Sequence, residues 1–195
     1  MQLFNDFDCG DLIREIERIG AAVVPQFLSA DTLAILLEEL NDAEWYPIPQ
    51  LVGLSDMDCV RAVGLPLRSA CNIVACEASH ALMESFGKSG VSPFSGSLDF
   101  NFAQALRYRA GSRGMGAHQD PERARNVVGI VVLEAGGRFR ICDDVQGSNP
   151  VSVSHEAGDL ILMRAPGFLG SFARPFHLVD LVMTQRTTIV LRQLA

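Results

Sequence analysis

The order of apolar and polar residues divides the chain into a helical first half and a β-rich second half. Over residues 11–19 apolar side chains recur at helical spacing, and residues 21–25 form a short apolar run that predicts a strand. A second helix is predicted over residues 29–41, with Ser29 as its N-cap. A third helix is predicted from about residue 70 to residue 86.

From about residue 98 the pattern changes to short β-rich runs separated by Gly, Pro, Asp and Ser. These runs cover residues 101–108, 127–133, 138–142, 151–153, 159–164 and 187–191. Closely spaced short strands are typical of a sandwich or barrel. With 195 residues and no internal repeat, the sequence predicts one domain over residues 1–195. In it a helical N-terminal layer, residues 1–97, packs on a β core, residues 98–195.

Composition excludes several other classes of protein. Hydrophobic residues make up 48% of the chain and charged residues 20%, which is typical of a globular protein and not of a disordered one. No apolar stretch approaches the roughly 18 residues of a membrane span, and the acidic N-terminus does not resemble a signal peptide. We therefore expect a cytoplasmic protein without a membrane partner. The five cysteines lack CxxC spacing and are expected to be reduced thiols.

Charge is distributed unevenly around a net value of −7. Residues 1–100 hold 5 basic and 15 acidic side chains, whereas residues 101–195 hold 11 basic side chains, all arginine, and 8 acidic ones. The acidic first half would repel a long polyanion, so a nucleic-acid substrate is disfavoured. The charge pattern favours a small anionic or neutral substrate. It does not indicate the oligomeric state.

Three residues that commonly bind metals stand where they can converge on one ion. In an extended segment, residues two apart point to the same side, so His118 and Asp120 can converge on one metal ion. His177, beside a later β segment, offers a third group. Two imidazoles and one carboxylate form the facial triad of non-haem Fe(II) oxygenases, which leaves positions open for substrate and O₂. A lone His-x-Asp motif also occurs by chance at turns, so the residues around it decide whether metal binding is the better interpretation.

An arginine follows the third of these residues at a fixed interval. Arg186 comes nine residues after His177, and on a strand it shares one face with Thr188 and Arg192. An arginine that faces the interior of a barrel is costly unless an anion pairs with it. A dicarboxylic cosubstrate, held by the planar guanidinium fork, would be that anion.

Five segments, in this order, resemble the Fe(II)/2-oxoglutarate-dependent dioxygenases. They are Leu106-Arg107-Tyr108 with Gly111, then His118-Gln119-Asp120, then Gly136-Gly137 with the strand after it, then residues 158–162, and finally residues 174–177 through Arg186. The resemblance covers about residues 100–192. It implies a mainly β fold with N-terminal helices (α+β), whose core is a double-stranded β-helix, or jelly roll.

The resemblance also implies a role for each matched residue. The Fe(II) ligands would be His118, Asp120 and His177. Arg186 would bind the distal carboxylate of 2-oxoglutarate, with Thr188, Tyr108 and Arg192 as further cosubstrate-binding residues. The reaction would be hydroxylation, or demethylation through hydroxylation, of a small substrate, with decarboxylation of 2-oxoglutarate to succinate. Ascorbate is a candidate stimulant.

Features of two branches of this superfamily occur together. The R-x5-R spacing of Arg186 and Arg192 resembles the AlkB-type nucleic-acid demethylases, although Leu106 stands where that branch has an Asn. The nine-residue interval before Arg186 and the Gly136-Gly137 pair resemble the prolyl-hydroxylase-like and small-molecule branches. Two alternatives therefore stay open: an AlkB-like nucleic-acid demethylase, and a non-catalytic jelly-roll protein that binds a metal or ligand.

Three other features could serve function or structure. His155 lies in a turn and is interpreted as structural rather than as a proton carrier. Trp45 and Tyr46 could form a lid over the substrate, but a plug between layers is the favoured use of the Trp. A run of arginines could recruit an anionic substrate or form a solvated face: Arg107, Arg109, Arg113, Arg123 and Arg125.

Overall fold

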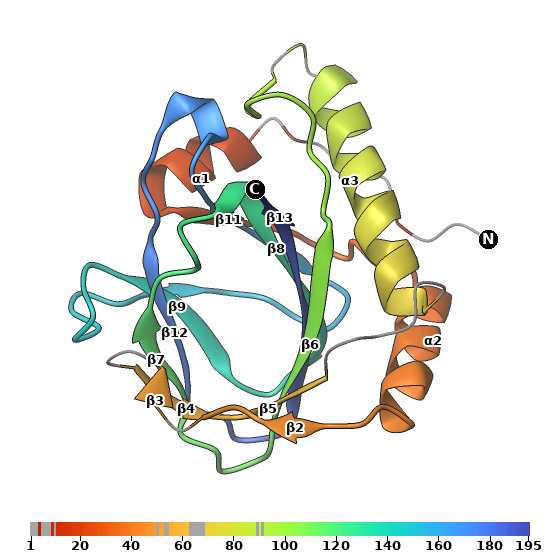
Figure 1. The fold of residues 1–195 in the computed structure, drawn as a ribbon, viewed down its shortest axis with the longest axis vertical. Coiled ribbons are helices and arrows are strands. Elements are labelled where there is room, and N and C mark those ends of the chain that lie inside the picture. Colours follow the sequence, from red (N-terminus) through yellow and green to blue (C-terminus); the bar gives the residue numbers. More distant parts are fainter. Residues whose placement is uncertain are drawn as a thin grey trace.

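Two antiparallel β-sheets face each other, and helices cover the outer side of one of them (Figure 1). This architecture comes from a computed structural model, which describes residues 4, 9, 11–49, 51–52, 55–62, 69–88, 90 and 92–195. The two sheets form the jelly-roll core that the sequence predicts.

The larger sheet has seven strands in the order β1-β11-β8-β13-β6-β5-β2. Their bounds are Ala21–Val24 (β1), Tyr46–Pro47 (β2), Val60–Ala62 (β5), Phe102–Tyr108 (β6), Ala124–Ala135 (β8), Leu160–Arg164 (β11) and Arg186–Leu194 (β13). The smaller sheet has six strands in the order β10-β9-β12-β7-β4-β3. Their bounds are Leu51–Val52 (β3), Ser55–Asp58 (β4), Gly114–His118 (β7), Arg138–Cys142 (β9), Val151–Val153 (β10) and Phe176–Asp180 (β12).

The three helices, α1 (Leu12–Ile19), α2 (Ala30–Asn41) and α3 (Ala70–Lys88), pack on the seven-stranded sheet. Side chains of the helices and of the sheet's outer face form one apolar core, and the inner faces of the two sheets form a second. The central strands of the larger sheet are thus buried on both sides, which explains why residues 127–133 read as a continuous apolar run.

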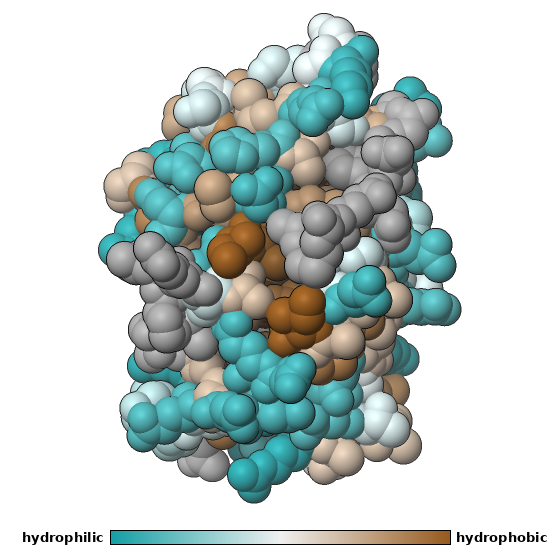
Figure 2. Space-filling model, turned by 90° about the vertical axis from the view of Figure 1, so that its right-hand side faces the viewer, coloured by the Kyte–Doolittle hydropathy of each residue, from teal (hydrophilic) through white to brown (hydrophobic). Residues whose placement is uncertain are grey.

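The solvent side of α2 and α3 is mostly hydrophilic, with single apolar residues among the polar ones (Figure 2). Ile35 of α2 and Ile73 of α3 are 40% and 46% exposed. Scattered apolar side chains of this kind are ordinary for a protein surface. None of the helices that the structure describes is long and apolar enough to cross a membrane.

The predicted helices agree with α1, α2 and α3 to within two residues. The expectation of little β structure in the first hundred residues is wrong for residues 46–62, where β2 to β5 extend both sheets. These strands are two to four residues long and carry Pro47 in β2, an edge strand that tolerates proline. Strands this short lack the periodic pattern that would have predicted them.

Gly136, in the turn between β8 and β9, shows why the Gly-Gly pair matters for the site. A Cβ atom at this position would lie 2.0 Å from the backbone oxygen of Thr184. The backbone N–H of Met183 donates to the Gly136 carbonyl at 2.9 Å. This close approach fixes the segment that leads into β13, and it thereby sets where Arg186 begins that strand.

Trp45 is a plug between layers, as the sequence favours. The Arg107 guanidinium lies 4.1 Å from the centre of its ring, and its indole N–H donates to the Leu40 carbonyl at 3.2 Å. Neither Trp45 nor the exposed Tyr46 is among the described residues that line the cavity between the sheets. The lid interpretation is therefore not supported.

Candidate functional site

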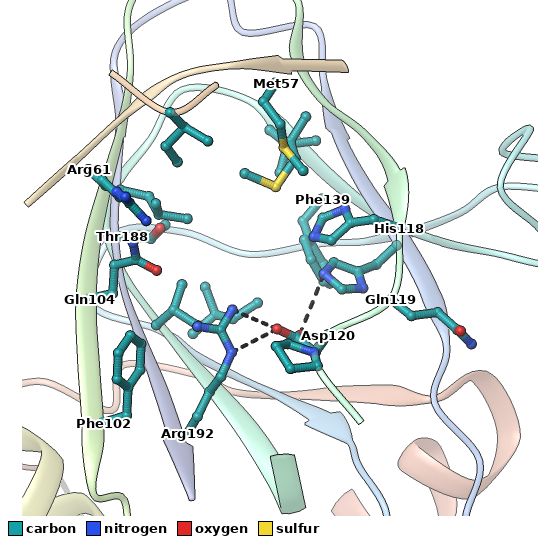
Figure 3. A pocket seen from close by; sticks show the side chains of 18 of the residues that line it. Met57, Arg61, Phe102, Gln104, His118, Gln119, Asp120, Phe139, Thr188 and Arg192 are labelled. Carbon is teal, nitrogen blue, oxygen red and sulfur yellow. Dashed lines mark hydrogen bonds and ion pairs between the residues drawn. The ribbon is translucent and has the colours of Figure 1, made fainter. Parts of the chain in front are cut away.

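A cavity of about 430 Å³ lies between the two sheets, a volume typical of small-molecule sites. One wall comes from β7 and β12 of the smaller sheet, and the opposite wall comes from β6 and β13 of the larger one (Figure 3). All seven residues that the sequence selects line it: Tyr108, His118, Asp120, His177, Arg186, Thr188 and Arg192. Strand pairing therefore brings together positions that lie up to 84 residues apart in the chain.

Two histidines face each other on the wall formed by the smaller sheet. His118 and His177 are direct partners in the pairing of β7 with β12, and their ring centres are 4.2 Å apart. Each Nδ1 lies near a backbone carbonyl two residues earlier, at 2.9 Å for His118 and 3.4 Å for His177. These contacts orient the rings and leave each Nε2 for a ligand.

Asp120 is buried just beyond the end of β7, next to both histidines. One carboxylate oxygen, Oδ2, lies 3.7 Å from Nε2 of His177. The other, Oδ1, accepts hydrogen bonds from Nε and Nη2 of Arg192 at 2.7 and 2.6 Å (Figure 3). The Arg192 fork, which the sequence analysis assigns to the cosubstrate, is therefore occupied by Asp120.

Burial and neighbouring charges set the protonation of these three groups. Burial lowers the pKa of His177 to about 3 and also lowers that of His118, so both imidazoles are neutral. Burial alone would raise the pKa of the Asp120 carboxyl, but Arg192 and the two histidines outweigh it and the pKa is lowered. Neutral imidazoles and an ionised carboxylate are the forms that bind a divalent metal.

The donor set fits Fe(II), but it is more widely spaced than a closed metal site. Among the described residues, one trio has ligand atoms that all lie within 4.8 Å of one another: Cys76, Glu77 and His80, exposed on α3. His118, Asp120 and His177 do not meet that limit, so their side chains would shift toward a bound ion. Their burial and protonation favour this triad over the exposed trio, because exposed groups of that kind are common without a metal.

Arg186 is a buried cation without a carboxylate partner in the part of the chain that the structure describes. It is 1% exposed, and its Nη1 donates to Nε2 of His155 at 2.6 Å. Its Nε is buried and has no hydrogen-bond partner among the described residues. Burial lowers its pKa to about 10, which still leaves the guanidinium charged at neutral pH. An orphaned, buried donor of this kind fits the carboxylate of a dicarboxylic acid.

Two hydroxyl groups line the cavity near this guanidinium. Tyr108 is the direct strand partner of Arg186, and Thr188 lies two residues along β13 on the same face. Both residues are 2% exposed. Burial raises the pKa of Tyr108, so its phenol stays protonated and can donate a hydrogen bond. Its hydroxyl lies 3.9 Å from the sulfur of Met115, a weak partner that a carboxylate can replace.

His155, which the sequence analysis interprets as structural, supports the site through its contact with Arg186. Its Nδ1 donates to the Val153 carbonyl at 2.7 Å, and this bond fixes the tautomer in which Nε2 accepts from Arg186. The histidine therefore positions the Arg186 guanidinium through this hydrogen bond. No local pattern marks this role, since the two residues are 31 positions apart and meet through the fold.

The five arginines do not form the rim around the cavity that their clustering in the sequence suggests. Arg107 packs on Trp45, and of the five arginines only Arg123 lines the cavity. The exposed Arg109 lies outside the cavity lining. Recruitment of an anion by the whole run is thus not supported.

The His155 contact predicts a pH dependence of stability. Burial and the Arg186 charge lower the pKa of His155 from 6.5, so the unfolded chain binds this proton more readily than the folded one. Stability from the neutral ring is complete above about pH 6.5 and is lost as pH falls through the folded pKa, with a slope of at most about 1.4 kcal/mol per pH unit. The His155→Gln variant can accept the same hydrogen bond but does not titrate. We therefore expect its stability to fall less steeply than that of the parent as the pH decreases. Urea unfolding at about pH 7.5 and about pH 5.5 measures it, and an unchanged slope would show that other groups are responsible.

Comparison with known proteins shows which solved structures share this fold. No family model and no curated protein sequence matches the chain. A 2OG-Fe(II) oxygenase family oxidoreductase from Burkholderia pseudomallei matches at 16% identity and a TM-score of 0.68, over 97% of this chain and 91% of that chain. A Pseudomonas putida prolyl-4-hydroxylase matches at 16% identity and 0.64, over 94% and 97%. The structure of OsALKBH1 matches at 16% and 0.61, over 89% and 98%. The chain therefore has the jelly-roll fold of the 2-oxoglutarate- and Fe(II)-dependent oxygenases.

Proposed function

We propose that this protein is an Fe(II)/2-oxoglutarate-dependent dioxygenase that hydroxylates, or demethylates through hydroxylation, a small substrate. One observation carries the proposal. A single cavity holds two neutral histidines and an ionised aspartate on one wall, and a buried arginine without an acidic partner among the described residues on the other. A binding module has no need for both features together.

In this proposal His118, Asp120 and His177 hold Fe(II), and Arg186 binds the distal carboxylate of 2-oxoglutarate, aided by Thr188 and Tyr108. When bound, Fe(II) and 2-oxoglutarate supply the oxidation, in which one atom of O₂ enters succinate and the other enters the substrate. The chain itself orients the cosubstrate through Arg186, which His155 holds in place. Apolar side chains around the cavity, including Ile130 and Val190, exclude water.

We propose that Arg192 keeps Asp120 ionised and aligned rather than binding the cosubstrate. Both of its hydrogen bonds go to Oδ1, so Oδ2 stays free beside His177. The backbone carbonyl of Asp120 also accepts a bond from Arg174 at 2.8 Å, which ties the end of β7 to the segment before β12. Arg192 thus holds the side chain of Asp120, and Arg174 holds its backbone.

We expect the Arg192→Met variant to be less stable than the parent protein, and we expect Fe(II) to restore part of that stability. Removing one partner of a buried ion pair leaves an unpaired charge, and we expect the free energy of unfolding to fall by about 3 kcal/mol. Fe(II) under anaerobic conditions should then raise Tm more in the variant than in the parent, because the carboxylate that lost the arginine gains the cation. Thermal unfolding with and without Fe(II) measures both effects.

The matched control is Arg138→Met, which breaks a more exposed pair with Asp180 on β12. This variant should lower the free energy of unfolding by less than about 1 kcal/mol, and Fe(II) should raise its Tm as much as that of the parent. A variant at Arg192 that is as stable as the parent would contradict the role given to this residue.

The experiment that tests the function is a screen for substrate-stimulated decarboxylation of 2-oxoglutarate. The panel should contain small carboxylic acids, their amides, and methylated nucleosides and oligonucleotides, because solved structures named as a prolyl hydroxylase and as an ALKBH protein match the fold about equally well. We expect stimulation by a small molecule. Stimulation by a methylated oligonucleotide, with binding that weakens steeply as salt rises, would favour the AlkB-like alternative.

A further inference from the structure

Arg61 and Gln104 are polar residues on the cavity wall to which the proposed function gives no role. Arg61 of β5, Leu106 of β6 and Thr188 of β13 are aligned across three neighbouring strands, so their side chains share one face of the larger sheet. Gln104 lies two residues before Leu106 and shares that face. In Figure 3 Arg61, Gln104 and Thr188 lie on one side of the cavity, across from His118 and Asp120.

Arg61 carries charge that nothing else in the described part of the chain balances. Its side chain is half-buried, its Nε is buried without a hydrogen-bond partner, and no ion pair to it is found among the described residues. The other arginines that line the cavity differ. Arg192 is paired with Asp120, Arg186 is held by His155 and takes the cosubstrate, and Arg123 is exposed to solvent. Among the described residues that line the cavity, Asp120 is the one carboxylate, and it is already paired with Arg192.

Apolar side chains line much of the cavity that Arg61 faces, which strengthens the need for an anion there. Ile48, Met57, Leu106 and Phe102 line the same cavity. A half-buried guanidinium beside such side chains loses part of its hydration, and an anionic partner can replace it. Its planar fork fits a carboxylate with two parallel hydrogen bonds, and the amide of Gln104 can donate a third.

We propose that Arg61 and Gln104 bind the carboxylate of the prime substrate, and that this substrate is a small, otherwise apolar monocarboxylic acid. The proposal rests on the proposed function, because the position across the cavity from the metal-binding triad is what makes this wall a substrate site. The cosubstrate is not the partner of Arg61, since the more deeply buried Arg186 with its two neighbouring hydroxyls already accounts for the distal carboxylate.

The test is isothermal titration calorimetry with matched acids and amides as probes. Phenylacetate and phenylacetamide, and hexanoate and hexanamide, are titrated into the anaerobic Fe(II) protein with and without saturating 2-oxoglutarate. Wild-type protein should bind each acid roughly ten- to a hundredfold more tightly than its amide, as expected for charge-assisted hydrogen bonds. Arg61→Gln should reduce that preference to about twofold or less and leave the affinity for 2-oxoglutarate unchanged.

Arg109→Gln is the matched control, because it removes the same charge from an exposed position outside the cavity lining. It should keep the full preference for acids. Arg61→Lys keeps the charge but loses the fork, and it should retain only part of the preference. This variant also keeps the test decisive if Arg61→Gln does not fold.

Four results would overturn the proposal. They are equal affinity of acid and amide in the wild-type protein, no binding of any acid, loss of 2-oxoglutarate affinity in Arg61→Gln, and Arg61-dependent binding of a single-stranded oligonucleotide more tightly than the acids. Failure of the proposed function gives a different result, in which neither the parent nor any variant binds 2-oxoglutarate. The preference for acids over amides can still be tested in that case, because the titrations are also made without 2-oxoglutarate.

Discussion

His177→Ala should abolish tight binding of Fe(II) by this protein. Three protein groups surround the proposed metal position, and His177 is the most deeply placed imidazole, 5% exposed and adjacent to both His118 and Asp120. Even changes to residues behind metal ligands weaken metal binding by about 10- to 100-fold, so loss of a ligand should exceed about a hundredfold. Anaerobic reconstitution followed by iron analysis should give about one Fe(II) per chain for the parent and almost none for the variant.

His80→Ala is the matched control, because it removes an imidazole from the exposed trio on α3. It should leave iron stoichiometry unchanged. His118→Ala and Asp120→Ala should behave like His177→Ala, since each opens the same face of three ligands. Normal affinity for iron in His177→Ala would refute the metal site that we propose.

Arg186→Lys should lose most of the affinity for 2-oxoglutarate while iron binding stays nearly intact. A lysine ammonium is a point charge that cannot make the paired contacts of the guanidinium fork, and it also loses the bond to His155. Loss of two charge-assisted hydrogen bonds corresponds to a roughly ten- to hundredfold weaker Kd. Calorimetric titration of 2-oxoglutarate into the anaerobic Fe(II) protein measures it.

A conservative change on the outside of the sheet controls for the loss of an arginine as such. Arg138→Lys, in β9, affects an exposed ion pair with Asp180 and should bind 2-oxoglutarate like the parent. If Arg186→Lys also binds like the parent, another cavity cation holds the cosubstrate. Arg61 would then be the first residue to replace, because it has no ion-pair partner among the described residues.

The parts of the site that follow from local spacing could be predicted from the sequence. His118 and Asp120 converge because neighbours two apart in extended chain share a side, and Arg186 and Thr188 share a face of one strand for the same reason. The position of His177 needed the resemblance as well, because strand pairing between β12 and β7 places it opposite His118.

The contacts that join distant segments could not be predicted in this way. Arg192 meets Asp120 across 72 positions, and His155 meets Arg186 across 31, and in both cases only the packing of the two sheets brings them into contact. Arg61 lies on β5, one of the short strands that the pattern of residues did not reveal, so its place in the cavity was equally hidden. Periodicity reports which side of an element is buried but not what lies across from it.

Formation of succinate from 2-oxoglutarate tests the central claim most directly. The purified protein is incubated in air with Fe(II), 2-oxoglutarate and ascorbate, without a prime substrate, and succinate is quantified. We predict slow succinate release that requires Fe(II) and disappears in His177→Ala. With 2-oxoglutarate kept near the Kd of the parent, it should also fall strongly in Arg186→Lys, with the unchanged His80→Ala as reference. Succinate formation that is absent from the parent, or equal in all four proteins, would contradict the assignment and favour a jelly-roll protein that binds a ligand without catalysis.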